Sequence, residues 1–148
     1  MALTCPNDGA PLTQAEEHHV VHERCPTCGG GWFTLEEFEE LEASAANQAA
    51  LAGTIEYAKR PASLSCPSCG KPMTAFDFRG NDLELDACDV EHGFWLGASA
   101  VERVRAIMRQ REHDLDRSAQ AERTWNLERE RGFHRDLGEK LRNFFRGR

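Results

Sequence analysis

Short apolar runs alternate with turn residues through the first hundred positions, which is the pattern of small β-hairpins followed by helices. Residues 73–78 and 83–86 are typical of two strands joined by a turn at 79–82. Val20 and Val21 favour a strand in an earlier hairpin. Thr34 and Glu37 have the spacing of a capping box, so a helix is expected to begin there. The apolar residues of that helix recur on one face: Leu35, Phe38 and Leu41.

The second half of the chain is dominated by polar residues at helical spacing. Residues 100–131 predict one long helix that is polar almost all round, and Gly132 is expected to break it. After the break comes a short amphipathic segment whose apolar residues are spaced by four, four and three positions: Phe133, Leu137, Leu141 and Phe144. Trp125 and Phe145 add further aromatic side chains to this part of the chain.

The first half of the chain contains an internal repeat. Shifting the sequence by 61 positions places residues 5–13 on residues 66–74, with Cys5 on Cys66 and Asp8 on Cys69. A shift of 63 positions places Cys25 on Cys88 and Trp32 on Trp95. A repeat of this length indicates one small structural unit that is used twice.

Composition and charge limit what such small units can do. Each repeat is about 40 residues long, and a core of that size needs a metal or disulfides to be stable. No signal peptide is visible and no apolar run is long enough to span a membrane, so we expect a cytoplasmic protein. Disulfides are disfavoured in that compartment, so we expect the six cysteines to bind metal. Residues 1–100 carry 5 basic and 16 acidic side chains, which disfavours nucleic-acid binding there, whereas residues 101–148 carry 13 basic and 9 acidic ones.

The second repeat offers three thiols and one imidazole in two closely spaced pairs. The candidate ligands are Cys66, Cys69, Cys88 and His92. A hairpin between the pairs would bring them together, and three thiolates with an imidazole suit tetrahedral zinc. Glu91 competes with His92 for the fourth position, and we favour His92 because an oxygen ligand matches a thiolate set less well.

The first repeat offers the corresponding set with one substitution. The candidate ligands are Cys5, Asp8, Cys25 and Cys28, in which Asp8 replaces a cysteine. Aspartate is a legitimate zinc ligand. Three histidines on the intervening hairpin could replace it, and an open or metal-free site is a further alternative: His18, His19 and His22. The sequence therefore predicts two zinc ions per chain.

At residues 5–12 and 25–33 the chain resembles the bacterial zinc ribbons of the transcription-factor-IIB type. Those residues read Cys-Pro-Asn-Asp-Gly-Ala-Pro-Leu and Cys-Pro-Thr-Cys-Gly-Gly-Gly-Trp-Phe, and residues 66–70 repeat the first half. Residues 88–96 resemble a variant in which a His-Gly pair precedes the tryptophan. The resemblance covers residues 4–41 and 65–104. It implies a ribbon fold with zinc and a protein-binding role.

These features predict a small zinc-stabilised α+β protein with two tandem zinc ribbons, each followed by a helix, and a long C-terminal helix. The expected parts are ribbon 1 (1–42), a helical linker (43–63), ribbon 2 (64–104) and the helix with its basic, aromatic tail (105–148). We expect a non-enzymatic, zinc-binding adaptor, transcription-associated in view of the family, that binds a protein partner or itself through the C-terminal helix, in part as a coiled coil. Weak nucleic-acid binding by the basic tail is the alternative. No nucleophile triad or phosphate-binding loop is apparent, so no catalytic residue is predicted.

Overall fold

The computed structural model describes residues 2–147, which form two compact units that divide between Glu112 and His113. The elements follow the order β1 (Thr13–Glu17), β2 (Val20–Arg24), β3 (Gly31–Phe33), α1 (Leu35–Ala43), α2 (Gln48–Leu51), β4 (Glu56–Ser65), β5 (Pro72–Phe78), β6 (Glu84–Ala87), β7 (Phe94–Leu96) and α3 (Ala100–Arg146). The chain is thus a small α+β protein whose last element is a 47-residue helix.

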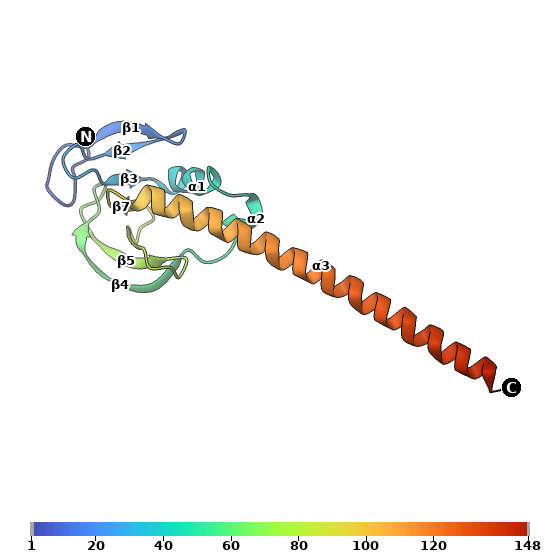
Figure 1. Ribbon diagram of the computed structural model, residues 1–148. Helices are drawn as coiled ribbons and strands as arrows, with labels where there is room; N and C mark the ends of the chain where they lie inside the picture. Colours follow the sequence, from blue (N-terminus) through green and yellow to red (C-terminus); the bar gives the residue numbers. More distant parts are fainter. Residues whose placement is uncertain (1, 148) are drawn as a thin grey trace. The chain divides into compact units, whose positions relative to one another are not determined.

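All seven strands of the described residues belong to one antiparallel sheet, in the order β1-β2-β3-β7-β6-β5-β4 (Figure 1). The first repeat supplies β1 to β3 and the second supplies β5 to β7. They meet where β3 pairs with β7, with Trp32 directly opposite Trp95. Equivalent strands that pair antiparallel at equivalent residues are related by a local two-fold axis. The two repeats therefore form one sheet and one compact unit.

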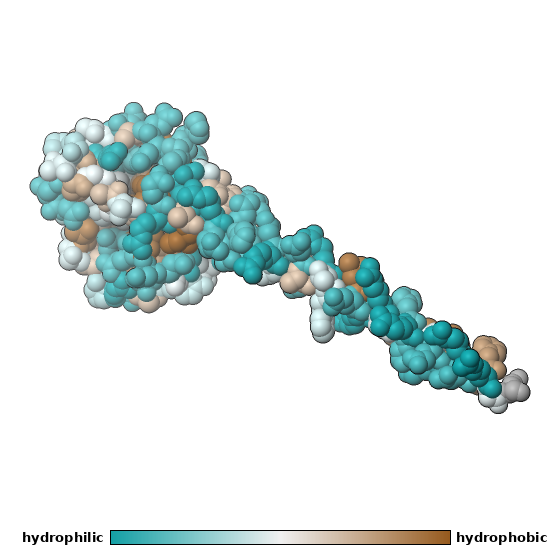
Figure 2. Space-filling view, viewed as in Figure 1, coloured by the Kyte–Doolittle hydropathy of each residue, from teal (hydrophilic) through white to brown (hydrophobic). Residues whose placement is uncertain are grey.

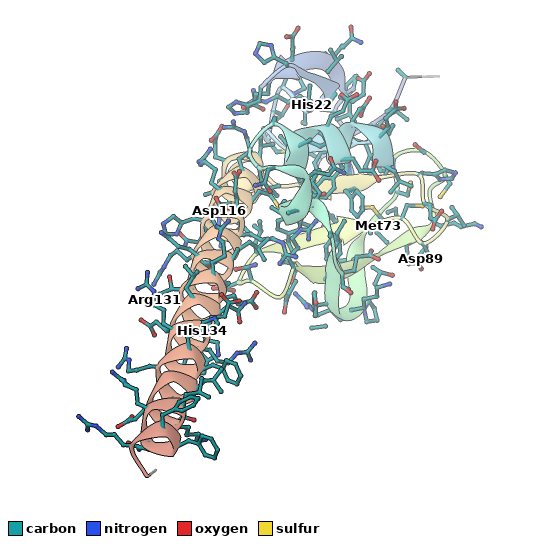
Figure 3. All side chains as sticks on the ribbon, turned by 90° about the vertical axis from the view of Figure 1, so that its right-hand side faces the viewer. His22, Met73, Asp89, Asp116, Arg131 and His134 are labelled. Carbon is teal, nitrogen blue, oxygen red and sulfur yellow. The ribbon has the colours of Figure 1, made fainter. Side chains whose placement is uncertain are left out.

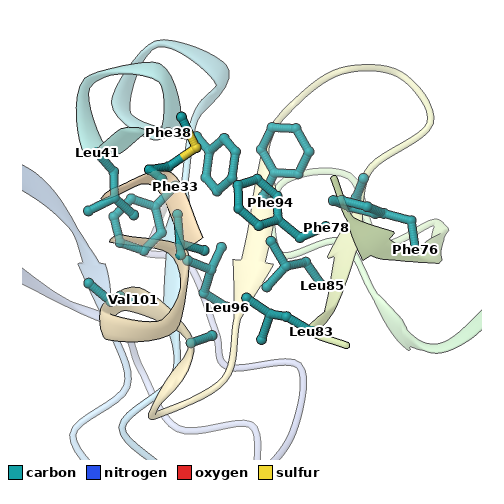
Figure 4. Packing of buried hydrophobic residues seen from close by; sticks show 14 of the residues in the cluster. Phe33, Phe38, Leu41, Phe76, Phe78, Leu83, Leu85, Phe94, Leu96 and Val101 are labelled. Carbon is teal, nitrogen blue, oxygen red and sulfur yellow. The ribbon is translucent and has the colours of Figure 1, made fainter. Parts of the chain in front are cut away.

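One face of the sheet is covered by α1, α2 and the first turns of α3. The buried cluster on this face contains Phe33, Phe38, Phe76, Phe94 and Val104, all at most 7% exposed (Figure 4). The rings of Phe38 and Phe94 lie 4.4 Å apart, so α1 of the first repeat packs directly on β7 of the second. The helix begins as the sequence predicts, because Thr34 and Glu37 form the capping box.

A second buried cluster joins the two tryptophans to the cysteines. It contains Trp32 and Trp95, each 2% exposed, with Leu12, Met73 and four cysteines: Cys5, Cys25, Cys66 and Cys88. Successive side chains of a strand point to opposite faces. Trp32 therefore lies on the side of the sheet opposite to Phe33, and the cysteine-rich turns pack on that side.

Two expectations for secondary structure are wrong. The helical linker expected over residues 43–63 contains only the single turn of α2, and residues 56–65 form β4, which pairs with β5 at the edge of the sheet. Pro61 is compatible with this strand because an edge strand has one side without a neighbouring strand, where the N–H that proline lacks is not needed for pairing. Gly132 does not break α3, which continues to Arg146 because good helix formers flank the glycine.

Candidate metal centre

Four tight turns hold the predicted ligands, and three of them have the same backbone hydrogen bonds. In the turn at Cys5, the N–H of Gly9 donates to the carbonyl of Cys5 at 2.9 Å and the N–H of Cys5 donates to the carbonyl of Ala10 at 2.8 Å. The turns at Cys25 and Cys66 repeat this pair of bonds. The glycine that closes each of these turns has φ between +73° and +77°, a conformation that favours glycine.

The fourth turn has one extra residue between its two candidate ligands. The N–H of Cys88 donates to the carbonyl of Gly93 at 3.0 Å, as in the other turns, but the N–H of Glu91 donates to the carbonyl of Cys88 at 3.0 Å. Glu91 takes the positive φ, +60°, that glycine has elsewhere. The ring of His92 is thereby brought to the two thiols that Cys66 and Cys88 present.

In the first repeat, the structure brings together Cys5, Asp8, Cys25 and Cys28, with one ligand atom from each within 4.8 Å of the others. The Sγ atoms of Cys5 and Cys28 are 3.6 Å apart. The Sγ of Cys25 lies 3.4 Å from Oδ2 of Asp8. The carboxylate is held in place by the N–H of Ala10, which donates to Oδ1 at 2.9 Å.

In the second repeat, the structure brings together Cys66, Cys69, Cys88 and His92, again within 4.8 Å. The Sγ atoms of Cys69 and Cys88 are 3.7 Å apart. Nδ1 of His92 lies 3.5 Å from Sγ of Cys88 and 3.9 Å from Sγ of Cys66. Nδ1 is thus the imidazole atom that faces the thiols.

These distances are the edges of a zinc-sized tetrahedron. Zinc–sulfur bonds of about 2.3 Å and zinc–nitrogen or zinc–oxygen bonds of about 2.1 Å give edges of about 3.8 Å between sulfurs and about 3.6 Å between a sulfur and a lighter atom. The observed edges of 3.4 to 3.9 Å agree with that geometry. They are much longer than a disulfide bond of about 2.05 Å, and all six cysteines are free thiols. Two zinc ions fit the two groups.

The two groups also have similar electrostatics. Burial raises the pKa of Cys5 to about 12 and that of Cys66 to about 11. The backbone N–H of Lys71 and the neighbouring ligands lower the pKa of Cys69 to about 7. Hydrogen bonding by the Ala10 N–H lowers the pKa of Asp8. Each group therefore combines an acidic ligand with a buried thiol, and zinc must displace the proton of that thiol.

The alternative ligands considered from the sequence lie outside the two metal groups. Among the described residues, neither metal group includes His18, His19, His22 or Glu91. His22 is 2% exposed and stacks on Phe33 with ring centres 4.3 Å apart. His18 and His19 form the two-residue turn between β1 and β2, with φ of +53° and +66°, and Nε2 of His18 lies 2.5 Å from Oε1 of Glu102. Asp8 is therefore the residue that completes the first group, and His92 completes the second.

Sequence reasoning missed one interaction that supports the arrangement. Glu42 at the end of α1 and Arg79 after β5 form a buried ion pair, Nε to Oε1 2.9 Å, with both side chains at most 3% exposed. It connects the first repeat to the second. The residues are 37 positions apart, and no local pattern indicates that they meet.

Comparison with known families bears on the first group. The family model of the transcription-factor-IIB-type zinc ribbon, described as a transcription factor zinc-finger, matches residues 4–44. The first repeat is a zinc ribbon of this type. The resemblance drawn from the sequence is thus confirmed for the first ribbon, and all four ligands of the first group lie inside the match. Neither a curated protein nor a solved structure matches the chain.

One further observation concerns membranes. Within residues 2–147, no helix combines the length and the apolar composition that crossing a bilayer requires.

Proposed function

We propose that this protein is a zinc-stabilised, non-enzymatic adaptor in which two zinc ribbons form one body and α3 carries a docking surface for another protein. The second ribbon is inferred from the first. The turns at Cys5 and Cys66 share their backbone hydrogen bonds, and the second metal group offers the same number of ligands. The family description ties ribbons of this type to transcription, so a transcription-associated partner is part of the proposal.

The ligand sets support a structural role for both metals. A catalytic zinc keeps one coordination position for water or substrate, whereas a structural zinc has four protein ligands. Each group here supplies four ligand atoms that lie within 4.8 Å of one another. Zinc bound in this way would hold the turns together and would leave no position for chemistry.

The observation that carries the docking proposal is an exposed apolar surface on the second unit, which we call the α3 apolar face. At 100° per residue its four side chains occupy an arc of about 80°. They are 45% to 66% exposed: Phe133, Leu137, Leu141 and Phe144. Figure 2 shows apolar groups between the hydrophilic ones along this part of α3, and Figure 3 shows Arg131 and His134 on the same segment.

An exposed face of this composition favours a protein over a nucleic acid. A few side chains that become fully buried, with aromatic residues prominent among them, provide most of the binding energy at protein interfaces. Residues 127–147 carry six basic and four acidic side chains, a net charge of only +2. Binding to a phosphate backbone through this segment would therefore be weak and strongly salt-dependent.

Photo-crosslinking tests this proposal directly. Benzoylphenylalanine would replace Leu141 on the α3 apolar face and, in a matched control, Glu139 on the opposite side of the same helix turn. We expect discrete protein adducts in cells from position 141 and not from position 139. Sedimentation velocity of the purified chain then shows whether the adduct is a second copy.

A double variant, Leu137→Gln with Phe144→Gln, provides the second test. It removes apolar area without disrupting the helix, which circular dichroism would verify. We expect the adducts from position 141 to disappear. Equal yields from positions 139 and 141, or adducts that persist in the double variant, would contradict the proposed docking surface.

A further inference from the structure

The two-fold relation between the repeats leaves one strand position without an equivalent. The strand that precedes the second repeat, β4, lies along the outer edge of β5, with Arg60 opposite Ala75 and Glu56 opposite Phe78. The 61-residue shift of the repeat places Pro11–Glu17 on Pro72–Phe78, so β1 is the equivalent of β5. In the sheet order, β1 is the terminal strand, and no strand of the described residues pairs with its outer edge.

Hydrogen bonding shows where this open edge begins. The N–H of Leu12 donates to the carbonyl of Leu3 at 2.9 Å, and Thr4 pairs with Pro11. This short pairing is the equivalent of Ser65 with Pro72, the end of β4. Residues of an antiparallel strand alternate between its two neighbours. The N–H of Leu12 points to the edge of β1 that faces away from β2, so the N–H and C=O groups of Gln14 and Glu16 point to that edge as well.

The side chains on the two equivalent edges differ in exposure. On β5, which β4 flanks, Thr74 and Asp77 are half-buried and Ala75 is buried. On β1, the residues Thr13, Gln14 and Glu16 are exposed. The β1 edge thus presents a free hydrogen-bonding ladder that is open to an extended chain.

Charge indicates which extended chain would fit. Arg60 of β4 binds Asp77 of β5, Nη2 to Oδ1 3.1 Å. The equivalent of Asp77 on β1 is Glu16, and Glu17 follows it, with no basic residue in the strand. Two copies of β1 paired with each other would bring these carboxylates together, which is unfavourable. A strand that carries lysine or arginine would be attracted.

We propose that the outer edge of β1, residues 12–17, is a docking site for an extended basic segment of a partner protein, which adds antiparallel as an eighth strand. Acidic residues on an edge strand also prevent aggregation, and the experiment below separates the two roles. The edge belongs to the unit that ends at Glu112 and the α3 apolar face to the unit that begins at His113. This inference therefore stands independently of the proposed function.

A peptide with the sequence of residues 54–65 is the probe, because it contains the strand that already covers the equivalent edge and carries Lys59 and Arg60. It would be added to the full-length, zinc-loaded chain while amide hydrogen exchange is followed by NMR. We expect saturable binding that slows exchange at Gln14 and Glu16 by about fivefold or more, as new backbone hydrogen bonds require. Binding should weaken as salt is raised.

Two variants locate the site. Glu16→Lys reverses the charge at the edge and should weaken peptide binding at least about fivefold, whereas Glu39→Lys makes the same change at an exposed position of α1 and should have no effect. Glu16→Pro removes only an outward N–H, so the pairing of β1 with β2 survives and peptide binding is lost.

Three results would overturn the proposal. The first is equal protection by a control peptide in which Lys59→Glu and Arg60→Glu remove the basic residues. The second is protection at β5 instead of β1, which would mean that the peptide replaces β4. The third is unchanged peptide binding in the Glu16→Lys chain, which would mean that the acidic residues of the edge only prevent aggregation.

Discussion

Replacing Arg79 by methionine should destabilise the protein in a way that depends on pH. The Arg79 guanidinium donates to Oε1 of Glu42 at 2.9 Å and to the carbonyls of Leu51 and Ala52 at 2.9 and 3.0 Å. Arg79→Met leaves the Glu42 carboxylate buried without its partner. Removing one member of a buried pair costs about 3–5 kcal/mol, and we expect that loss of unfolding free energy at pH 8.

The pH dependence follows from the ionisation of Glu42. Burial already raises the pKa of Glu42, and Arg79 opposes that rise. Without Arg79 the pKa must rise further, so the folded variant holds a proton that the unfolded chain releases above about pH 4.3. The unfolding free energy of the variant therefore falls as pH rises from about 4.3 towards the raised pKa of Glu42 in the folded variant, by at most about 1.4 kcal/mol per pH unit. The difference from the parent chain should be smaller at pH 6 than at pH 8.

Urea unfolding with saturating zinc, followed by tryptophan fluorescence, measures this difference because Trp32 and Trp95 become exposed. The control is the double variant Arg79→Met with Glu42→Leu, which replaces the pair by apolar side chains of similar size. It should recover most of the loss at pH 8 and show no extra pH dependence. A single variant as stable as the parent at pH 8, or a double variant no better than the single one, would refute the reasoning.

Three further predictions concern the metal groups and the junction of the repeats. Native mass spectrometry should find two zinc ions per chain. Asp8→Ala should weaken the binding of one zinc ion, whereas Asp8→Cys should retain both. An unchanged zinc content and affinity in Asp8→Ala would exclude Asp8 as a ligand. Chelation should unfold residues 64–96, because structural zinc contributes about 10–16 kcal/mol in small domains, and a retained pattern of amide protection would contradict this. Gly93→Ala should cost on the order of 3 kcal/mol in urea unfolding, since a Cβ there would lie 2.1 Å from the Phe33 carbonyl oxygen, whereas Gly97→Ala has open space and should be nearly neutral.

The ligand sets could be predicted from sequence because they depend on local chemistry. Two ligands three or four residues apart in a tight turn share one site whatever the rest of the fold does, and the repeat pairs the turns. The competition between Asp8 and His22 needed the structure, since only packing shows that His22 is stacked on Phe33.

The joining of the repeats could not be predicted, because it depends on contacts between distant residues. The pairing of β3 with β7 joins residues 61 to 65 positions apart. The alanine-rich composition around residues 43–52 favours a helix, and proline is uncommon within strands, yet β4 forms with Pro61 in it because β5 offers an edge. Tertiary pairing overrode local propensity there.

The shared cluster around Trp32 and Trp95 has a thermodynamic consequence for metal loading. It contains two cysteines from each metal group, packed within the same unit. Metal that binds only the folded state stabilises that state by mass action, so we expect zinc in one metal group to raise the affinity of the other, and the reverse holds equally. Loading should therefore be positively cooperative. We therefore expect the unit of residues 2–112 to fold and unfold as a whole when zinc is supplied or removed.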